Sequence, residues 1–164
     1  MDCAKNITVA FSGHRTYAGE ACDELREVVV RLYNEGYRCF LCGMAWGFDL
    51  AAGEVVAELK RVHTDVELVA VVPYEGFYRL FHAEDAEQYR RVADAADEVV
   101  VVSEDESKAA FRLRNDYLVE NSSIVVAWFN GVPRGGTAYT LRQARRQGVL
   151  IENLFHSAQL LLEF

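Results

Sequence analysis

Residues 66–73 read Val-Glu-Leu-Val-Ala-Val-Val-Pro, an almost wholly apolar run that a proline ends. Residues 99–102 and 124–127 are continuously apolar as well, whereas a strand with one face in water would alternate apolar and polar residues. Strands buried on both faces have this composition, and they belong to parallel sheets that helices cover on each side. The three runs therefore predict a parallel sheet at the centre of the fold.

Segments with helical periodicity separate the apolar runs and predict the covering helices. Between Glu20 and Glu35, for example, the apolar residues fall on one helical face, and Gly36 is placed to cap the C-terminus. We expect strands at residues 6–11, 37–42, 66–72, 98–102 and 124–129, helices at about 20–35, 50–63, 86–96, 111–120 and 138–147, and a last apolar run at 149–151. This alternation predicts an α/β protein of Rossmann type, with an open, mainly parallel sheet and helices on both faces.

Length and composition fit one such domain. A chain of 164 residues buries roughly 70% of its unfolded surface, so it can build a core of its own. Its 51% hydrophobic and 26% charged residues are typical of a globular protein. No apolar run approaches the ~20 residues that cross a bilayer, and the first five residues lack the order of a signal peptide. We therefore expect a single domain over residues 1–164, a cytoplasmic location and no membrane segment.

The charge balance bears on the partners. The chain has 17 basic and 25 acidic side chains, a net charge of −8. Contacts from lysine and arginine to phosphate supply most of the non-specific affinity for nucleic acid, so this balance makes nucleic acid an unlikely partner. A small anion remains compatible, because backbone amides and one or two arginines can hold it.

Cys39 and Cys42 form a C-x-x-C pair inside an apolar run. Residues three apart in a strand point to opposite faces, and neither a second pair nor a histidine pair lies nearby in the sequence. The pair therefore predicts neither a metal site nor a redox centre.

Ligands of open α/β sheets bind beyond the carboxyl ends of the strands, so the loops at those ends are the candidate site. Gly13, His14 and Arg15 follow the first strand, where a glycine permits a tight turn and close approach of a ligand. The alternative is a plain turn with two exposed polar side chains.

The loop after the second strand leads directly into a helix. Gly43 and Gly47 can turn backbone N–H groups toward a phosphate. Asp49 either caps the helix or accepts a hydrogen bond from a ligand, and Trp46 either stacks on a base or fills the sheet edge. The motif is neither G-x-G-x-x-G nor a Walker sequence.

Two further segments add single candidates. Tyr74, in the loop after Pro73, is a candidate for a pocket wall or an ordinary aromatic anchor. Arg114, next to Asn115, lies one helical turn before Leu118 and hence beside the buried stripe of its helix. Such an arginine either pairs with a carboxylate at the core edge or contacts a ligand phosphate.

The loop after the fifth strand provides the strongest signal. It contains Gly131, Gly135, Gly136 and Thr137 and opens the last helix. Glycines there allow close backbone approach, and the helix macrodipole adds about half a positive charge. The alternative is a plain loop with Thr137 as the N-cap. Three arginines later in this helix, at 142, 145 and 146, predict a solvated face.

These segments, in this order, resemble the SLOG superfamily, the Rossmann-like domains related to DprA and to the Lonely Guy enzymes, and most closely its YpsA-like branch. The residues that carry the resemblance are Gly13-His14-Arg15, residues 43–54 with Glu54, Pro73 and the loop after it, Arg114-Asn115, and Gly131 with Gly135-Gly136-Thr137. The resemblance implies a sensor or adaptor that binds a nucleotide-derived ligand, such as ADP-ribose, NAD or a nucleoside monophosphate, at the strand ends. It leaves open whether the protein is a homodimer.

One departure weighs against catalysis. Lonely Guy enzymes hydrolyse nucleoside monophosphates with a P-G-G-x-G-T-x-x-E motif and an arginine that Arg114 matches. In this chain the motif glutamate is missing, and no carboxylate occurs between residues 131 and 151. Glu54 or Asp49 would have to replace it, since such chemistry needs an acid or base. We therefore expect a binding protein, with a phosphoribohydrolase as the first alternative and a DprA-like nucleic-acid-binding protein as the second.

Overall fold

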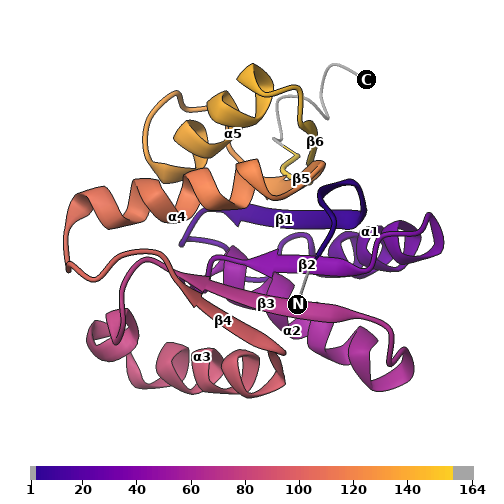
Figure 1. The fold of residues 1–164 in the computed structure, drawn as a ribbon, viewed down its shortest axis with the longest axis horizontal. Coiled ribbons are helices and arrows are strands. Elements are labelled where there is room, and N and C mark those ends of the chain that lie inside the picture. Colours follow the sequence, from indigo (N-terminus) through magenta and orange to yellow (C-terminus); the bar gives the residue numbers. More distant parts are fainter. Residues whose placement is uncertain (1–2, 157–164) are drawn as a thin grey trace.

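The apolar runs pair side by side into one sheet. The computed structural model describes residues 3–156, and its strands are β1 (Thr8–Gly13), β2 (Cys39–Cys42), β3 (Glu67–Val72), β4 (Glu98–Val101), β5 (Ile124–Trp128) and β6 (Leu150–Asn153). They lie in the order β4-β3-β2-β1-β5-β6, and every neighbouring pair is parallel (Figure 1). The predicted α/β fold class is confirmed.

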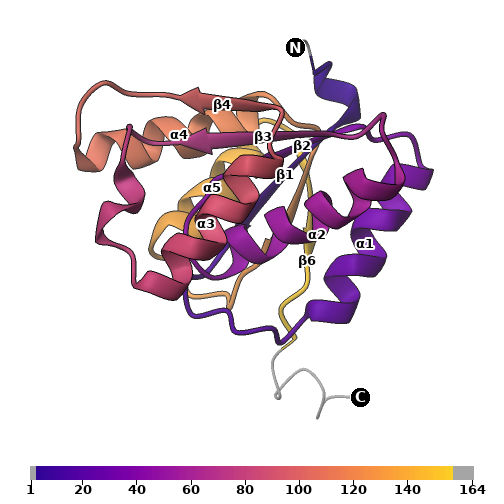
Figure 2. The ribbon, with the colours of Figure 1, turned by 90° about the horizontal axis from the view of Figure 1, so that it is seen from below.

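Two helical layers cover the sheet. The helices are α1 (Cys22–Asn34), α2 (Phe48–Val62), α3 (Ala83–Ala95), α4 (Lys108–Glu120) and α5 (Gly136–Arg146), and short 3₁₀ turns lie at η1 (Lys5–Ile7) and η2 (Phe77–Leu80). Figure 1 shows α4 and α5 on one side of the sheet and the other three helices opposite, and Figure 2 shows those three lying over the sheet. No helix in the described part of the chain is long and apolar enough to span a bilayer.

The core divides into two clusters, one on each face of the sheet. Cys42 belongs to the cluster under α1 and α2, whereas Cys39 belongs to the cluster under α4 and α5. The two thiols of the C-x-x-C pair therefore point to opposite faces, as the strand period predicts. Cys39 forms a disulfide with Cys3, which the sequence did not suggest. Within residues 3–156 no group of acidic, cysteine or histidine side chains could hold a metal ion.

The predicted burial was wrong for one strand. Strands β3 and β5 are buried nearly throughout, as their apolar runs indicate. In β4, however, Val99 is 51% and Val101 is 47% exposed. The reason is topological, because β4 lies at the edge of the sheet and the helices pack mainly over the inner strands. A run of valines cannot distinguish a central strand from an edge strand.

Some element boundaries differ from those predicted, and two of the shifts matter for the site. The first strand begins at Thr8, after η1, and extends to Gly13, so that glycine ends the strand instead of following it. The last helix begins at Gly136, two residues early. Of the apolar run at 149–151, residues 150 and 151 belong to the sixth strand, which extends to Asn153.

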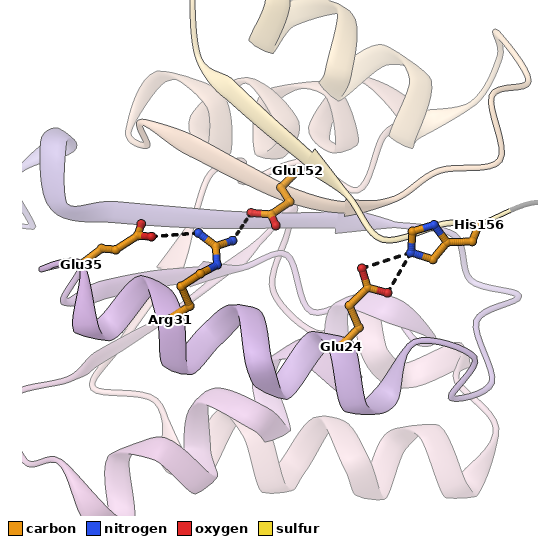
Figure 3. A network of polar contacts seen from close by, with 5 residues as sticks. All are labelled: Glu24, Arg31, Glu35, Glu152 and His156. Atoms are coloured by element: carbon orange, nitrogen blue, oxygen red, sulfur yellow. Dashed lines mark hydrogen bonds and ion pairs between the residues drawn. The ribbon is translucent and has the colours of Figure 1, made fainter. Parts of the chain in front are cut away.

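Exposed polar contacts link β6 and His156 to α1 (Figure 3). Arg31 bonds to Glu35 at 3.0 Å and also to Glu152 of β6. His156 lies 2.9 Å from Glu24, which comes seven residues, or about two helical turns, before Arg31 on α1. Contacts this exposed stabilise the fold by at most about 1 kcal/mol each, but together they link β6 and His156 to α1.

Candidate functional site

A cavity of about 550 Å³ opens at the carboxyl ends of β1 and β5. The strand order reverses at this point, because the chain runs from β1 through β4 to one side and continues with β5 on the other. Such a switch point is where open α/β sheets bind their ligands. The lining residues are Ser12, Gly13, His14, Arg15, Thr16, Ala45, Asp49, Phe111, Arg114, Asn115, Leu118, Asn130, Gly136 and Thr137.

The predicted site residues divide into a wall and a support. Those on the wall are Gly13, His14, Arg15, Asp49, Arg114, Asn115, Gly136 and Thr137. Those that do not line the cavity are Gly43, Trp46, Gly47, Glu54, Tyr74, Gly131 and Gly135. The end of β1 with the loop after it and the helices α2, α4 and α5 thus meet at one cavity, as the strand-end rule predicts, and the binding role of each residue stays a prediction.

Two glycines of the supporting group permit close packing beneath the wall. A Cβ on Gly43 would lie 2.9 Å from Asp49 Oδ2 and 3.2 Å from Arg114 Nη1. At Gly47, where φ is +87°, a Cβ would lie 2.7 Å from the Cα of Arg15. These glycines therefore bring other site residues together. At Gly131 and Gly135, where φ is also positive, an added Cβ would meet nothing within 4 Å.

The aromatic candidates act through Arg15. The Arg15 guanidinium lies 4.2 Å from the ring centroid of Trp46 and 5.9 Å from that of Phe111. Tyr74 packs edge-on behind Phe111, with 5.9 Å between ring centroids. Trp46 thus holds the arginine by a cation–π contact at the cavity, and Tyr74 anchors the ring beside it.

Glu54 points away from the cavity. It accepts hydrogen bonds from Gln88 at 3.1 Å and from Arg91 at 2.9 Å, both on α3. Of the two carboxylates that could replace the missing motif glutamate, only Asp49 lines the cavity.

His14 joins the two strands that bracket the switch point. Its Nε2 accepts a hydrogen bond from the backbone N–H of Asn130 at 3.0 Å, and the ring lies against Trp128 and Phe129. Because Nε2 accepts, the neutral ring has its proton on Nδ1.

Arg114 lines the cavity and lies near the carboxylate of Asp49, but it forms no ion pair with it in the described part of the chain. It is only 6% exposed, its Nε donates to Asn115 Oδ1 at 2.8 Å, and its Nη1 donates to the carbonyl of Gly43. Burial lowers the pKa of Arg114, and the charge of nearby Asp49 raises it. The arginine thus faces a carboxylate at the core edge and also lines the cavity.

Asp49 is not the helix cap that was one of its two expected roles. The N-cap position belongs to Gly47, because the chain becomes helical at Phe48, and Asp49 is the second helical residue. Its Oδ2 accepts a hydrogen bond from the Ala45 N–H at 3.4 Å, whereas its Oδ1 is buried and has no hydrogen-bond partner. Burial raises the pKa of Asp49 to about 6, although the positive charge of Arg114 opposes the shift.

The N-terminus of α5 forms another part of the wall. Gly135 occupies the N-cap position with φ of +92°, and no side chain caps the helix. Thr137, the alternative cap, lies inside the first turn and is buried. The first N–H groups of any helix lack intrahelical partners and carry partial positive charge. This end of the cavity therefore favours an anion.

Sequence reasoning missed six lining residues: Ser12, Thr16, Ala45, Phe111, Leu118 and Asn130. A signal existed for some of them. Phe111 and Leu118 lie at helical spacing on either side of Arg114 and Asn115, so one stripe of α4 faces the cavity. Asn130 follows β5 directly, where the strand-end rule applies.

Comparison with known proteins agrees with this geometry. The family model called YpsA, described as the YspA SLOG family, matches residues 11–151, which include every lining residue. The chain belongs to the YpsA family of SLOG proteins. This confirms the resemblance that the strand-end loops indicated.

Two curated relatives of this YpsA-family chain are moderately similar to it. The UPF0398 protein BH1768 of Halalkalibacterium halodurans is 27% identical over 148 residues, which cover 88% of this chain and 77% of that protein. The SPbeta prophage-derived protein YoqJ of Bacillus subtilis is 28% identical over 138 residues, 76% of this chain and 80% of YoqJ.

Solved structures of DNA processing protein A (DprA) share the fold. The Streptococcus pneumoniae protein superimposes with a TM-score of 0.68 at 20% identity and covers 94% of this chain, which spans only 52% of that protein. The Helicobacter pylori protein, studied for its single-stranded DNA binding mode, superimposes with a TM-score of 0.69 at 17% identity, over 96% of this chain and 72% of its own. At these identities the likeness concerns the fold alone.

Proposed function

We propose that the cavity binds a phosphate-bearing nucleotide derivative, such as ADP-ribose, NAD or a nucleoside monophosphate, and that the protein acts as a sensor or adaptor for it. The observation that supports this proposal is the meeting of two guanidinium groups and an uncapped helix N-terminus at one cavity. A volume of about 550 Å³ also suits a molecule of this size.

The electrostatics of the wall favour an anion near Arg15. The positive charge of Arg15 lowers the pKa of Arg114, so the two guanidinium groups repel each other. Only one carboxylate, that of Asp49, lines the same cavity, and it lies on the Arg114 side. A phosphate between Arg15 and the N-terminus of α5 would reduce the repulsion and accept hydrogen bonds from backbone N–H groups.

Thermal unfolding with AMP, ADP-ribose and NAD tests this proposal. At a hundredfold excess over its dissociation constant, a ligand adds about 2.7 kcal/mol to the free energy of unfolding, which a melting scan detects. Arg15→Ala should abolish the shift. Arg112→Ala is the matched control, because Arg112 is also exposed and also lies over an aromatic ring, Tyr139, but does not line the cavity. The proposal fails if none of the three nucleotides changes the melting temperature.

The same incubations examine the hydrolase alternative. Asp49 is an acid at the cavity wall with a pKa of about 6, which suits a proton donor or acceptor near neutral pH. Release of free adenine from AMP, or of nicotinamide from NAD, by the wild type but not by Asp49→Asn would make the protein an enzyme.

An uneven charge distribution favours nucleic acid as a second candidate partner. Residues 108–146 contain seven lysines and arginines but two acidic residues, a net charge of +5, whereas the rest of the chain has −13. These residues form α4 and α5, which share one face of the sheet, and Arg112 lies 5.2 Å from the ring centroid of the half-buried Tyr139. A basic helical face with an aromatic ring suits a single strand, despite the overall charge of −8.

Fluorescence anisotropy with a labelled single-stranded oligonucleotide, measured at increasing salt, tests the second candidate. Binding should weaken steeply with salt and fall further in Arg112→Glu and Arg142→Glu. Arg61→Glu, on α2 across the sheet, serves as the control and should bind as the wild type does. Absence of binding at low salt excludes this candidate.

A further inference from the structure

The strongest unexplained feature of the cavity is a pair of buried, oppositely charged groups without a direct bond. Asp49 and Arg114 are each 6% exposed and line the same wall. Each influences the pKa of the other. Arg114 nevertheless donates to Asn115 and to the Gly43 carbonyl, Asp49 accepts from Ala45, and no ion pair between the two is present in the described part of the chain.

One carboxylate oxygen of Asp49 is buried without a hydrogen-bond donor. Asp49 Oδ1 is shielded from solvent and accepts no hydrogen bond. A buried polar atom without a partner costs about 1–3 kcal/mol, and more if the group is charged. Because the terminal torsion of a carboxylate is broad, a modest rotation can turn this oxygen toward a ligand in the cavity.

The chemistry of the pair discriminates between ligand groups. A phosphate oxygen at neutral pH could accept from Arg114, but it offers no proton to Asp49 and would be repelled by the carboxylate. A hydroxyl group can do both, since it donates to a carboxylate and accepts from a guanidinium at the same time. The pair therefore suits an alcohol. The charge of Arg15 acts on Asp49 less strongly than that of Arg114 does, so Arg15 and the N-terminus of α5 suit the phosphate better.

We infer that Asp49 and Arg114 form a subsite for a sugar hydroxyl, so that the cavity distinguishes a ribose from a sugar that lacks one of its two hydroxyl groups. This inference rests on the proposed function, because it assigns the second half of the same ligand. Groups of one cavity would then bind both parts of the ligand: Arg15, after β1, and the N-terminus of α5 would hold the phosphate, and Asp49 of α2 with Arg114 of α4 would hold the hydroxyl.

Isothermal titration of AMP, 2′-deoxy-AMP and 3′-deoxy-AMP against the wild type tests the inference. At least one deoxy analogue should bind tenfold or more weakly than AMP, a difference of about 1.4 kcal/mol at 25 °C. Asp49→Asn keeps the shape of the side chain but removes the charge, so AMP should lose affinity and the ratio should fall below about threefold. Arg61→Ala, at the other end of α2 and outside the cavity, should preserve the wild-type ratio.

The outcomes separate the two proposals. If AMP and both analogues bind equally to the wild type, the hydroxyl subsite is wrong and the nucleotide proposal stands. If Asp49→Asn discriminates as strongly as the wild type, another residue reads the hydroxyl, and the inference is again overturned. If none of the three binds, the hydroxyl subsite for AMP is overturned, and the melting scans with ADP-ribose and NAD decide the nucleotide proposal. The comparison of ligands on the wild type needs no variant, so it remains decisive even if Asp49→Asn does not fold.

Discussion

Burial of the Asp49 carboxylate has a consequence for stability that can be measured without any ligand. The folded protein holds the pKa of this group at about 6, against 3.8 for an ordinary aspartate. An acid whose pKa rises on folding binds protons more tightly in the native state. Its contribution therefore favours folding below about pH 4 and is lost as the pH rises toward 6, above which no further loss follows.

The size of the effect follows from that difference in pKa. A difference of about two pH units, at about 1.4 kcal/mol per unit, corresponds to about 3 kcal/mol of stability lost between pH 4 and pH 7. Asp49→Asn cannot ionise and so lacks this loss. Relative to the wild type, the variant should become more stable by about 3 kcal/mol over this pH interval, whatever constant offset the amide introduces.

Urea unfolding of both proteins at pH 4, 5, 6 and 7 measures this quantity. All other titrating groups are shared, so they cancel in the difference between the two free energies of unfolding. Asp105→Asn, in an exposed loop, is the control for exchange of aspartate for asparagine. A difference that stays constant with pH, or that moves in favour of the wild type as the pH rises, would refute the claim that Asp49 is buried without adequate compensation.

Two further substitutions test the packing around the site and the sheet. Gly13→Ala should lower the free energy of unfolding by about 1–3 kcal/mol, because the added Cβ would lie 2.5 Å from ring atoms of Phe48. Gly136→Ala, at the cavity wall, is the control and should be tolerated. Urea unfolding compares the two variants, and equal stability would contradict the close packing at Gly13. Cys3→Ser should lower stability in oxidising buffer by roughly 3–4 kcal/mol, since the bond to Cys39 closes a loop of 36 residues. Reductant should destabilise the wild type equally and leave the variant unchanged; a wild type insensitive to reductant argues against the bond.

Part of the candidate site could be predicted from local sequence patterns. Glycines and polar residues after strands indicated the correct end of the sheet, because every parallel strand presents its carboxyl end at the same edge. The prediction went too far where it treated each residue of those loops as a ligand contact. Trp46 and Gly43 were selected by position, but their contacts are with Arg15 and with the Asp49–Arg114 pair.

Two residues of one sequence motif on the same helix can point to different parts of the protein surface. Asp49 and Glu54 are five positions apart, which turns their side chains by about 140° around α2. One faces the cavity, and the other bonds to Arg91 of α3. The spacing alone shows that the two carboxylates diverge, but only the docking of α2 against the sheet decides which of them meets Arg114.

Apolar runs, helical periodicity and turn glycines were sufficient for the fold class, because each depends on residues close together in the chain. The edge position of β4, the bond between Cys3 and Cys39, and the approach of Asp49 to Arg114 were not accessible in this way. Each of these features depends on which strands are neighbours in the sheet and on how the helices pack against them. Those choices are made by long-range packing, in which residues far apart in sequence compete for the same buried space.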